Sequence, residues 1–303
     1  MKGILPSLNT PFTNSGELDL ASLTRLVEHT ILSGCGGMLG LAVAGEHSTL
    51  NFDEKILFIK TVTEVNKGRI PFICSVTAAD FNESVELTKS ANSFGAEGIC
   101  LQLPSNLKFS EKLFFLEQLG ILSPKILMIQ DLDWLGDGMA LDEIVKLFNS
   151  VDKFNWLKIE TVGAGEKYTS VLQKLDGRLK VCGGWAVTQL IDAMARSVNA
   201  FVPTGLEKIY VEIYQLYQNG NTEKARLLFE KVLPVLNFSN QNIGTSIRFF
   251  KNLRVLEGLF ESNYCRDESA VFDELQEIEA VKATSIANRL LASYSKNDLY
   301  KIY

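Results

Sequence analysis

The sequence lacks the residue patterns on which several classes of protein depend. Its 2 histidines and 5 cysteines are scattered, and the cysteines form no C-x-x-C pair. This pattern favours buried free thiols over disulfide bonds or a zinc site. The 30 Lys and Arg residues form no basic cluster, and the net charge is −6, which argues against a nucleic-acid partner. We therefore expect a protein without a bound metal or cofactor.

Long apolar runs are also missing. No window of about 18 uninterrupted apolar residues occurs. The N-terminal stretch M-K-G-I-L-P does not lead into the apolar core and small-residue cleavage site of a secretion signal. These absences predict a cytoplasmic protein that does not enter a membrane. With 303 residues, 46% of them hydrophobic, the chain is long enough for one large α/β barrel or for two ordinary domains.

Short apolar segments alternate with segments of helical periodicity along most of the chain. The apolar segments are rich in Ile, Leu and Val without regular polar positions, which is typical of parallel strands buried on both faces. We predict strands at 3–12, 34–44, 70–77, 98–103, 125–130, 156–161, 179–183 and 200–203. We predict helices between them at 19–32, 51–66, 82–94, 110–119, 141–150, 166–174 and 186–196.

Eight strands joined by helices predict a (β/α)8 TIM barrel over residues 1–222. An open doubly wound sheet is the alternative, and the absence of a G-x-G-x-x-G motif after the first strand argues against it. Three helical patterns at 223–236, 240–261 and 268–293 then predict a C-terminal helical domain at 223–303. Its apolar residues exceed what one face of a barrel needs, which favours a homo-oligomer, either a dimer or a tetramer.

Lys158 interrupts the apolar stretch N-W-L-K-I-E-T at 155–161. Burying an unpaired ammonium is costly, so a lysine at this position indicates either a function or an ion pair. The functional interpretation is an amine nucleophile that forms a Schiff base with a carbonyl compound. The structural interpretation is a lysine paired with Glu160, because residues two apart on a strand point to the same side.

The carboxyl ends of the strands are where the chemistry of such a barrel lies. Residues at or near those ends are candidates for the substrate site: Thr10, Val43, Ala44, Gly45, Glu46, Gln130, Asp131, Gly183, Gly184 and Val202. Gly45 and Glu46 suit either an anion-binding loop or a helix cap. Gly183 and Gly184 either leave room for a ligand close to the backbone or form a structural turn.

The order and spacing of several short motifs resemble those of the dihydrodipicolinate synthase and N-acetylneuraminate lyase superfamily. The motifs are T-P-F at 10–12, G-E at 45–46, K-I-E at 158–160, G-G at 183–184 and the helical C-terminal region. The resemblance implies a (β/α)8 barrel, usually a homotetramer. It also implies that a lysine on the sixth strand condenses with the keto group of pyruvate or a related 2-oxo acid, and Lys158 matches that lysine.

The proton relay of the resembling enzymes is not matched. Their hydroxyl pair falls on Val43 and Ala44, and the tyrosine that ends their fifth strand falls on Gln130. The tyrosine that a neighbouring subunit lends in the synthases falls within P-S-N at 104–106. The arginine that holds their second substrate has no counterpart near Leu135. Valine, alanine and glutamine cannot act as general acids or bases in the relevant pH range.

Three functions remain compatible with these residues. The first is a class I Schiff-base lyase or aldolase with Lys158, Gln130 and Glu160 as candidate catalytic residues, in which Glu160, Asp131 or a bound water moves the protons. The second is a non-catalytic or regulatory barrel that binds a small oxo acid. The third, which the missing relay argues against, is dihydrodipicolinate synthase itself. The retained lysine favours the first function over the second.

Overall fold

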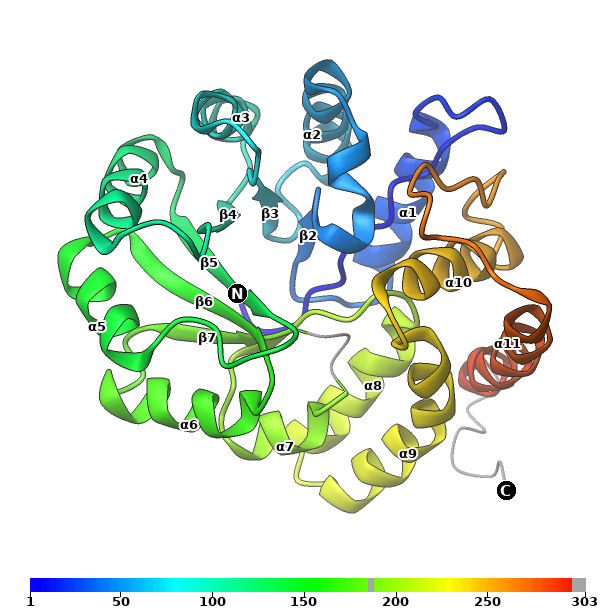
Figure 1. Cartoon of the computed structure of the whole chain (residues 1–303). Helices are drawn as coiled ribbons and strands as arrows, with labels where there is room; N and C mark the ends of the chain where they lie inside the picture. The colour runs from blue at the N-terminus through cyan, green and yellow to red at the C-terminus, as the bar shows by residue number, and fades with distance from the viewer. Residues whose placement is uncertain (185–187, 296–303) are drawn as a thin grey trace.

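Eight parallel strands form a barrel in the computed structural model, which describes residues 1–184 and 188–295 (Figure 1). The strands pair in the order β1-β8-β7-β6-β5-β4-β3-β2. The barrel closes between the first two strands, where Ser7 and Leu39 form a parallel bridge and the Leu8 amide donates to the Leu39 carbonyl at 2.9 Å. The predicted (β/α)8 architecture is confirmed.

Each strand lies within or overlaps a segment that the sequence predicts as a strand. The strands are β1 Gly3–Ile4, β2 Met38–Gly40, β3 Phe72–Ser75, β4 Gly98–Gln102, β5 Ile126–Asp133, β6 Phe154–Thr161, β7 Lys180–Gly183 and β8 Ala200–Phe201. The predicted second strand is too long, because Leu41 has a left-handed backbone with φ of 54°. The chain then makes two 3-10 turns over the barrel mouth, η1 Val43–Gly45 and η2 His47–Thr49.

Helices cover the outside of the barrel and continue beyond it (Figure 1). They are α1 Leu20–Leu32, α2 Phe52–Asn66, α3 Phe81–Phe94, α4 Phe109–Leu122, α5 Leu141–Ser150, α6 Ala164–Lys174, α7 Leu190–Ala195, α8 Glu207–Gln218, α9 Thr222–Ser239, α10 Ile243–Leu256 and α11 Glu274–Ser295. The predicted start of α7 falls at 186–187, outside the described residues. None of the helices within the described ranges is long and apolar enough to cross a membrane.

Local sequence explains where some helices begin and why one was missed. Asn51 caps α2: its side chain accepts from the Glu54 amide at 2.9 Å, and the Glu54 carboxylate accepts from the Asn51 amide at 3.0 Å. The sequence does not predict α8, because its aromatic and β-branched residues, such as Tyr210, Val211 and Ile213, are typical of strands. Packing of these buried residues in the helical layer outweighs that preference.

Alternation along β6 decides which side chains enter the barrel. Leu157 and Ile159 belong to the core between strands and helices, whereas Trp156 belongs to a separate core inside the barrel. Because successive side chains point to opposite faces, Lys158 and Glu160 lie on the interior side together with Trp156. The apolar inner core thus ends at Lys158, near the mouth.

Most of the apolar residues of the C-terminal helices are buried within the chain itself. α9 packs on α8, α11 packs on α9, and α10 packs on the turn η1 at the barrel mouth. The buried residues are Phe229, Leu236, Phe249, Phe250, Leu253 and Phe260. Leu227, Leu233 and Leu256 remain exposed, as do Leu275, Ile278 and Val281 of α11. The apolar surface that favours an oligomer is therefore smaller than the sequence indicates. The oligomeric state and the domain boundary at 222/223 stay predictions.

A buried charge cluster joins α1, α8 and α10. Arg254 and Glu207 are fully buried and form two contacts, one of them a 3.0 Å hydrogen bond from Nη1 to Oε2. Arg254 also contacts Glu257 at 3.0 Å, and His29 Nε2 lies 3.4 Å from Glu207 Oε2. Burial alone would raise the pKa of Glu207, but Arg254 and His29 hold that pKa well below its usual range.

Replacing Arg254 with alanine is expected to lower the free energy of unfolding by about 3–5 kcal/mol, because Glu207 would be left as an uncompensated buried charge. Chemical denaturation monitored by circular dichroism measures this change. Arg289→Ala is the matched control: Arg289 is exposed on α11, so its loss should change stability by about 0.5 kcal/mol or less. A loss below about 1 kcal/mol for Arg254→Ala would contradict the expectation.

Candidate active site

Lys158 lies on β6 at the upper end of the barrel interior, and its side chain is 4% exposed. It pairs in register with Gln130 on β5 and with Cys182 on β7. Cys182 and Cys100 belong to the inner core, and burial raises the pKa of the Cys100 thiol to about 12 and also raises that of Cys182. Both thiols are therefore neutral, so the Lys158 amine is the candidate nucleophile among these three neighbouring side chains.

A row of polar side chains leads from Lys158 across the neighbouring strands. Lys158 Nζ lies 2.9 Å from Glu160 Oε1, and the other carboxylate oxygen of Glu160 accepts a hydrogen bond from the Gln130 amide. Gln102 Nε2 in turn donates to Gln130 Oε1 at 3.3 Å. Gln130 thus orients the carboxylate, and Glu160 is the group placed to exchange a proton with Lys158.

Gly184 leaves space for the Glu160 side chain rather than for a ligand. A Cβ at this position would lie 2.0 Å from Glu160 Cγ, which no side chain can tolerate. A Cβ at Gly183 would lie 3.2 Å from the Tyr168 hydroxyl, a tighter contact than most. Close packing against Glu160 and Tyr168 is thus a third explanation for this glycine pair, beside the two sequence interpretations.

A cavity of about 60 Å³, which opens to solvent, lies above Lys158. Its wall is formed by Ser7, Ala42, Val43, Ala44, Gln130, Trp134, Lys158, Glu160, Val202, Thr204, Asn240, Asn242, Ile243 and Ser246. Most of the exposed wall is apolar. Several strand ends contribute to it, and the start of α10 closes it from the C-terminal region. A buried amine at the bottom of such a cavity is suited to react with a small carbonyl compound.

The structure brings together about half of the site residues predicted from the sequence. Those that line the cavity with Lys158 are Gln130, Glu160, Val43, Ala44 and Val202. Thr10, Gly45 and Glu46 do not line it. The Thr10 hydroxyl donates to the Gly45 carbonyl at 2.5 Å, and a Cβ on Gly45 would lie 2.8 Å from the Leu8 carbonyl oxygen. Thr10 and Gly45 therefore support the loop at the barrel mouth and do not form part of the cavity wall.

Asp131 is not available to Lys158, contrary to one of the sequence-based hypotheses. It follows Gln130 on β5, so its side chain points to the opposite face, where its carboxylate lies 2.5 Å from Lys167 Nζ on α6. Burial raises the pKa of Asp131, while Lys167 and the Met139 amide oppose part of this effect. Asp131 therefore serves the contact between barrel and helices, and Glu160 is the carboxylate at the lysine.

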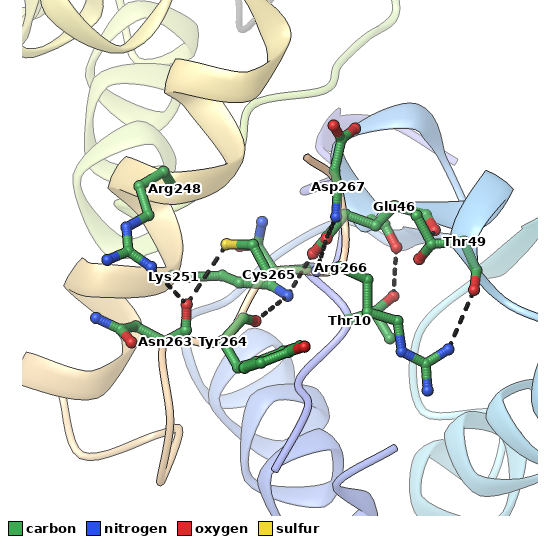
Figure 2. Close-up of polar contacts among 12 residues, drawn as sticks. Thr10, Glu46, Thr49, Arg248, Lys251, Asn263, Tyr264, Cys265, Arg266 and Asp267 are labelled. Atoms are coloured by element: carbon green, nitrogen blue, oxygen red, sulfur yellow. Dashed lines mark hydrogen bonds and ion pairs between the residues drawn. The ribbon is translucent and has the colours of Figure 1, made fainter. Parts of the chain in front are cut away.

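Glu46 holds the loop η1 to the C-terminal region, as Figure 2 shows. Its carboxylate pairs with the buried Lys251 and accepts hydrogen bonds from the amides of Arg266, at 2.7 Å, and Asp267, at 2.8 Å. The Lys251 ammonium also donates to the Tyr264 carbonyl at 2.7 Å. Burial lowers the pKa of Lys251, and Glu46 opposes part of this effect. The G-E motif is thus a brace for η1 in this protein.

Several wall residues were not predicted from the sequence, namely Ser7, Trp134 and the group Asn240, Asn242, Ile243 and Ser246. Trp134 directly follows the end of β5, and this position at the carboxyl end of a strand could have identified it as a candidate. Asn242 caps α10 by accepting from the Thr245 amide at 2.8 Å. The cap itself can be recognised in the sequence. The return of α10 to the barrel mouth cannot be recognised in the sequence, because it depends on how α9 and α10 pack.

Comparison with known proteins identifies the family of this chain. The family model described as the dihydrodipicolinate synthetase family matches residues 1–285. The chain belongs to the dihydrodipicolinate synthetase family. The resemblance seen in the sequence is therefore confirmed, and lyase-type chemistry is the activity common to such relatives.

Two curated relatives and one solved structure illustrate the range of the dihydrodipicolinate synthetase family. The L-2-keto-3-deoxyarabonate dehydratase of Azospirillum brasilense is 28% identical over 80% of this chain and 81% of the relative. The trans-O-hydroxybenzylidenepyruvate hydratase-aldolase of Pseudomonas aeruginosa is 33% identical over 35% of this chain and 33% of its own length. The structure of the 4-hydroxy-tetrahydrodipicolinate synthase of Methylacidiphilum fumariolicum SolV has a TM-score of 0.87 at 20% identity, covering 98% of this chain and 99% of that one.

Proposed function

We propose that this protein is a class I lyase or aldolase that binds a 2-oxo acid as a Schiff base on Lys158. The observation that carries the proposal is the buried Lys158 amine, 2.9 Å from a carboxylate and on the wall of a cavity. Family membership supports it, as do the printed names of the two curated relatives, one a dehydratase of a 2-keto acid and the other a hydratase-aldolase of a pyruvate derivative.

Glu160 provides the proton transfer in this proposal. Its Oε1 accepts a proton from Lys158, which frees the nitrogen lone pair to attack the carbonyl carbon of the 2-oxo acid. The same carboxyl group then donates its proton to the hydroxyl of the carbinolamine, and water leaves as the carbon–nitrogen double bond forms. Gln130 takes no proton and keeps the carboxylate turned toward the lysine.

In this proposal the carboxylate of the 2-oxo acid lies beside the turn η1. Val43 and Ala44 begin this turn, so their amides have no carbonyl partner within it, and both residues line the cavity. Backbone amides at the start of a turn bind anions without help from side chains. Binding of the carboxylate is therefore compatible with the replacement of the family's hydroxyl pair by Val43 and Ala44.

Reduction with borohydride in the presence of a 2-oxo acid tests the proposal, because it converts the imine into a stable secondary amine. We expect pyruvate or a related 2-oxo acid to leave a covalent adduct on the peptide that contains Lys158, identified by mass spectrometry. Folded protein that forms no adduct across a broad panel of 2-oxo acids would refute the proposal.

A non-catalytic barrel that binds an oxo acid is the second candidate. The observation in its favour is that Val43, Ala44 and Gln130 provide none of the hydroxyl groups of the family's relay at the cavity. Such a protein would bind the acid without turnover, and calorimetry together with trapping distinguishes the two. We also propose a homo-oligomer, on the basis of the family resemblance and the exposed apolar residues of the C-terminal helices.

Gly184→Ala is expected to slow adduct formation by about 100-fold, because the new Cβ would displace Glu160 from Lys158 and remove the proton transfer. The rate of adduct formation with pyruvate measures this effect. Gly120→Ala is the matched control: it lies on α4 with its nearest neighbouring atoms 3.5 Å from a Cβ, so the rate should stay unchanged. An unchanged rate in folded Gly184→Ala would show that Glu160 is not required.

A further inference from the structure

The loop after β5 carries Trp134 to the cavity and is organised by one carboxylate. Asp133 Oδ1 accepts hydrogen bonds from the amides of Leu135, at 3.1 Å, and Gly136, at 2.9 Å. Its Oδ2 accepts from the Gly138 amide at 3.3 Å. These amides hold the pKa of Asp133 below its usual range. The charged carboxylate thus shapes the backbone on the C-terminal side of Trp134, which itself lines the cavity.

A second carboxylate attaches the same loop to the body of the protein. Asp131 Oδ1 accepts from the Met139 amide at 2.8 Å, at the far end of the loop. Lys167 on α6 pairs with Asp131 and also donates to the Asp137 carbonyl. The loop is therefore held at both ends and in the middle. Trp134 is 38% exposed, but its backbone is positioned before any ligand arrives.

The charges of the cavity wall disfavour the binding of a second anionic group. Within residues 1–184 and 188–295, Lys158 is the one cation of this wall and Glu160 is the one anion, and the two are paired. The first carboxylate of a 2-oxo acid is matched by the charge of the iminium on Lys158. A second carboxylate would face Glu160 without a cation of its own, at an energetic cost.

The remaining wall suits a neutral group. Trp134, Val202 and Ile243 are apolar, and an aromatic ring prefers to pack against such side chains. The polar wall residues other than Lys158 and Glu160 are uncharged. Among them, Ser7 Oγ and Asn240 Nδ2 are buried without a hydrogen-bond partner in the described part of the chain. A ligand's neutral hydrogen-bonding groups could meet these two atoms without the desolvation cost of a charge.

We infer that the substrate carries an uncharged, predominantly apolar substituent on its 2-oxo acid unit, and that Trp134 is the residue that selects it. The inference rests on the proposed function, since it concerns the part of the substrate that lies beyond Lys158. Trp134 contacts the substituent, and the carboxylates of Asp131 and Asp133 position its loop. The class of substrate is thus a 2-oxo acid with an aryl or alkyl group, not a 2-oxo dicarboxylic acid.

The test compares three acids in the borohydride reaction: pyruvate, phenylpyruvate and 2-oxoglutarate. The concentration that gives half-maximal adduct on Lys158 is measured for each. For the wild-type chain we expect this concentration to be at least tenfold lower for phenylpyruvate than for 2-oxoglutarate. Trp134→Ala should reduce that preference about tenfold, and Trp134→Phe should keep it within about threefold, since phenylalanine retains an aromatic face.

Leu135→Ala is the matched control, because Leu135 is the next residue in the loop, is 98% exposed and does not line the cavity. It should leave the preference unchanged. Equal half-maximal concentrations for phenylpyruvate and 2-oxoglutarate in the wild-type chain would overturn the inference, as would an unchanged preference in Trp134→Ala. In either case an adduct with pyruvate would leave the proposed function standing. Failure of every acid to form an adduct would remove both.

Discussion

Replacing Lys158 with methionine or alanine is expected to abolish the adduct that pyruvate and borohydride form with this protein. The amine is the reacting atom, so its removal eliminates the imine rather than slowing its formation. Methionine is the sharper variant, because it keeps the length of the side chain in the inner core without the nitrogen. Mass spectrometry of the reduced protein measures the loss, which should be complete.

The same substitutions should leave the fold intact. Glu160 keeps its hydrogen bond from Gln130 and borders a cavity that is partly open, so its charge is not stranded in a closed interior. Lys153→Ala, at an exposed position shortly before β6, is the control and should keep the adduct. Adduct formation that persists in Lys158→Met would assign the chemistry to another lysine. Unfolding of both Lys158 variants would instead mark the ion pair with Glu160 as structural.

Synthesis of dihydrodipicolinate from pyruvate and aspartate semialdehyde is expected to be slower than ordinary enzyme turnover by at least about 10⁴-fold. General acid and base groups contribute about 10²- to 10⁴-fold each. Val43, Ala44 and Gln130 take the places of the hydroxyl groups that the resembling synthases use, and none of them can relay a proton. Pro104, Ser105 and Asn106 offer no tyrosine, and the described wall offers no arginine for the aldehyde's carboxylate.

Product formation measured by mass spectrometry, with an authentic synthase assayed in parallel, checks this expectation. The Schiff base with pyruvate should be trapped in the same samples, so that imine formation and condensation are seen separately. Turnover of about 1 to 10³ per second would contradict the prediction. It would mean that Val43, Ala44 and Gln130 do not occupy the positions of the family's relay, or that Glu160 alone performs these transfers.

The residues around Lys158 show which side-chain neighbours can be predicted from local sequence rules. Lys158 and Glu160 are two apart on a strand, so alternation alone predicts that they share a face, and their 2.9 Å contact agrees. The same rule separates Gln130 from Asp131, and applying it to β5 would have excluded Asp131 from the site. Gln130 beside Lys158 follows from the pairing of consecutive strands in a barrel.

The conformations of loops and the packing of segments far apart in the chain could not be predicted by such rules. Glu46 follows Val43 and Ala44 closely in the chain, but its left-handed backbone, with φ of 55°, turns its side chain away from the cavity and toward Lys251. The contribution of Asn240 and Ile243 to the wall depends on the angle at which α9 and α10 return to the barrel. No local pattern encodes that angle.

The sequence by itself determined the barrel, the strand that carries Lys158 and the resemblance to the family. These features depend on periodic burial and on residue identity, both of which are properties of neighbouring positions. Only the tertiary structure decided that Gly184 makes room for Glu160, that Glu46 is a brace, and that Trp134 and the start of α10 complete the cavity. These features depend on contacts between segments far apart in the chain, and the geometry of such contacts is set by the packing of the whole barrel.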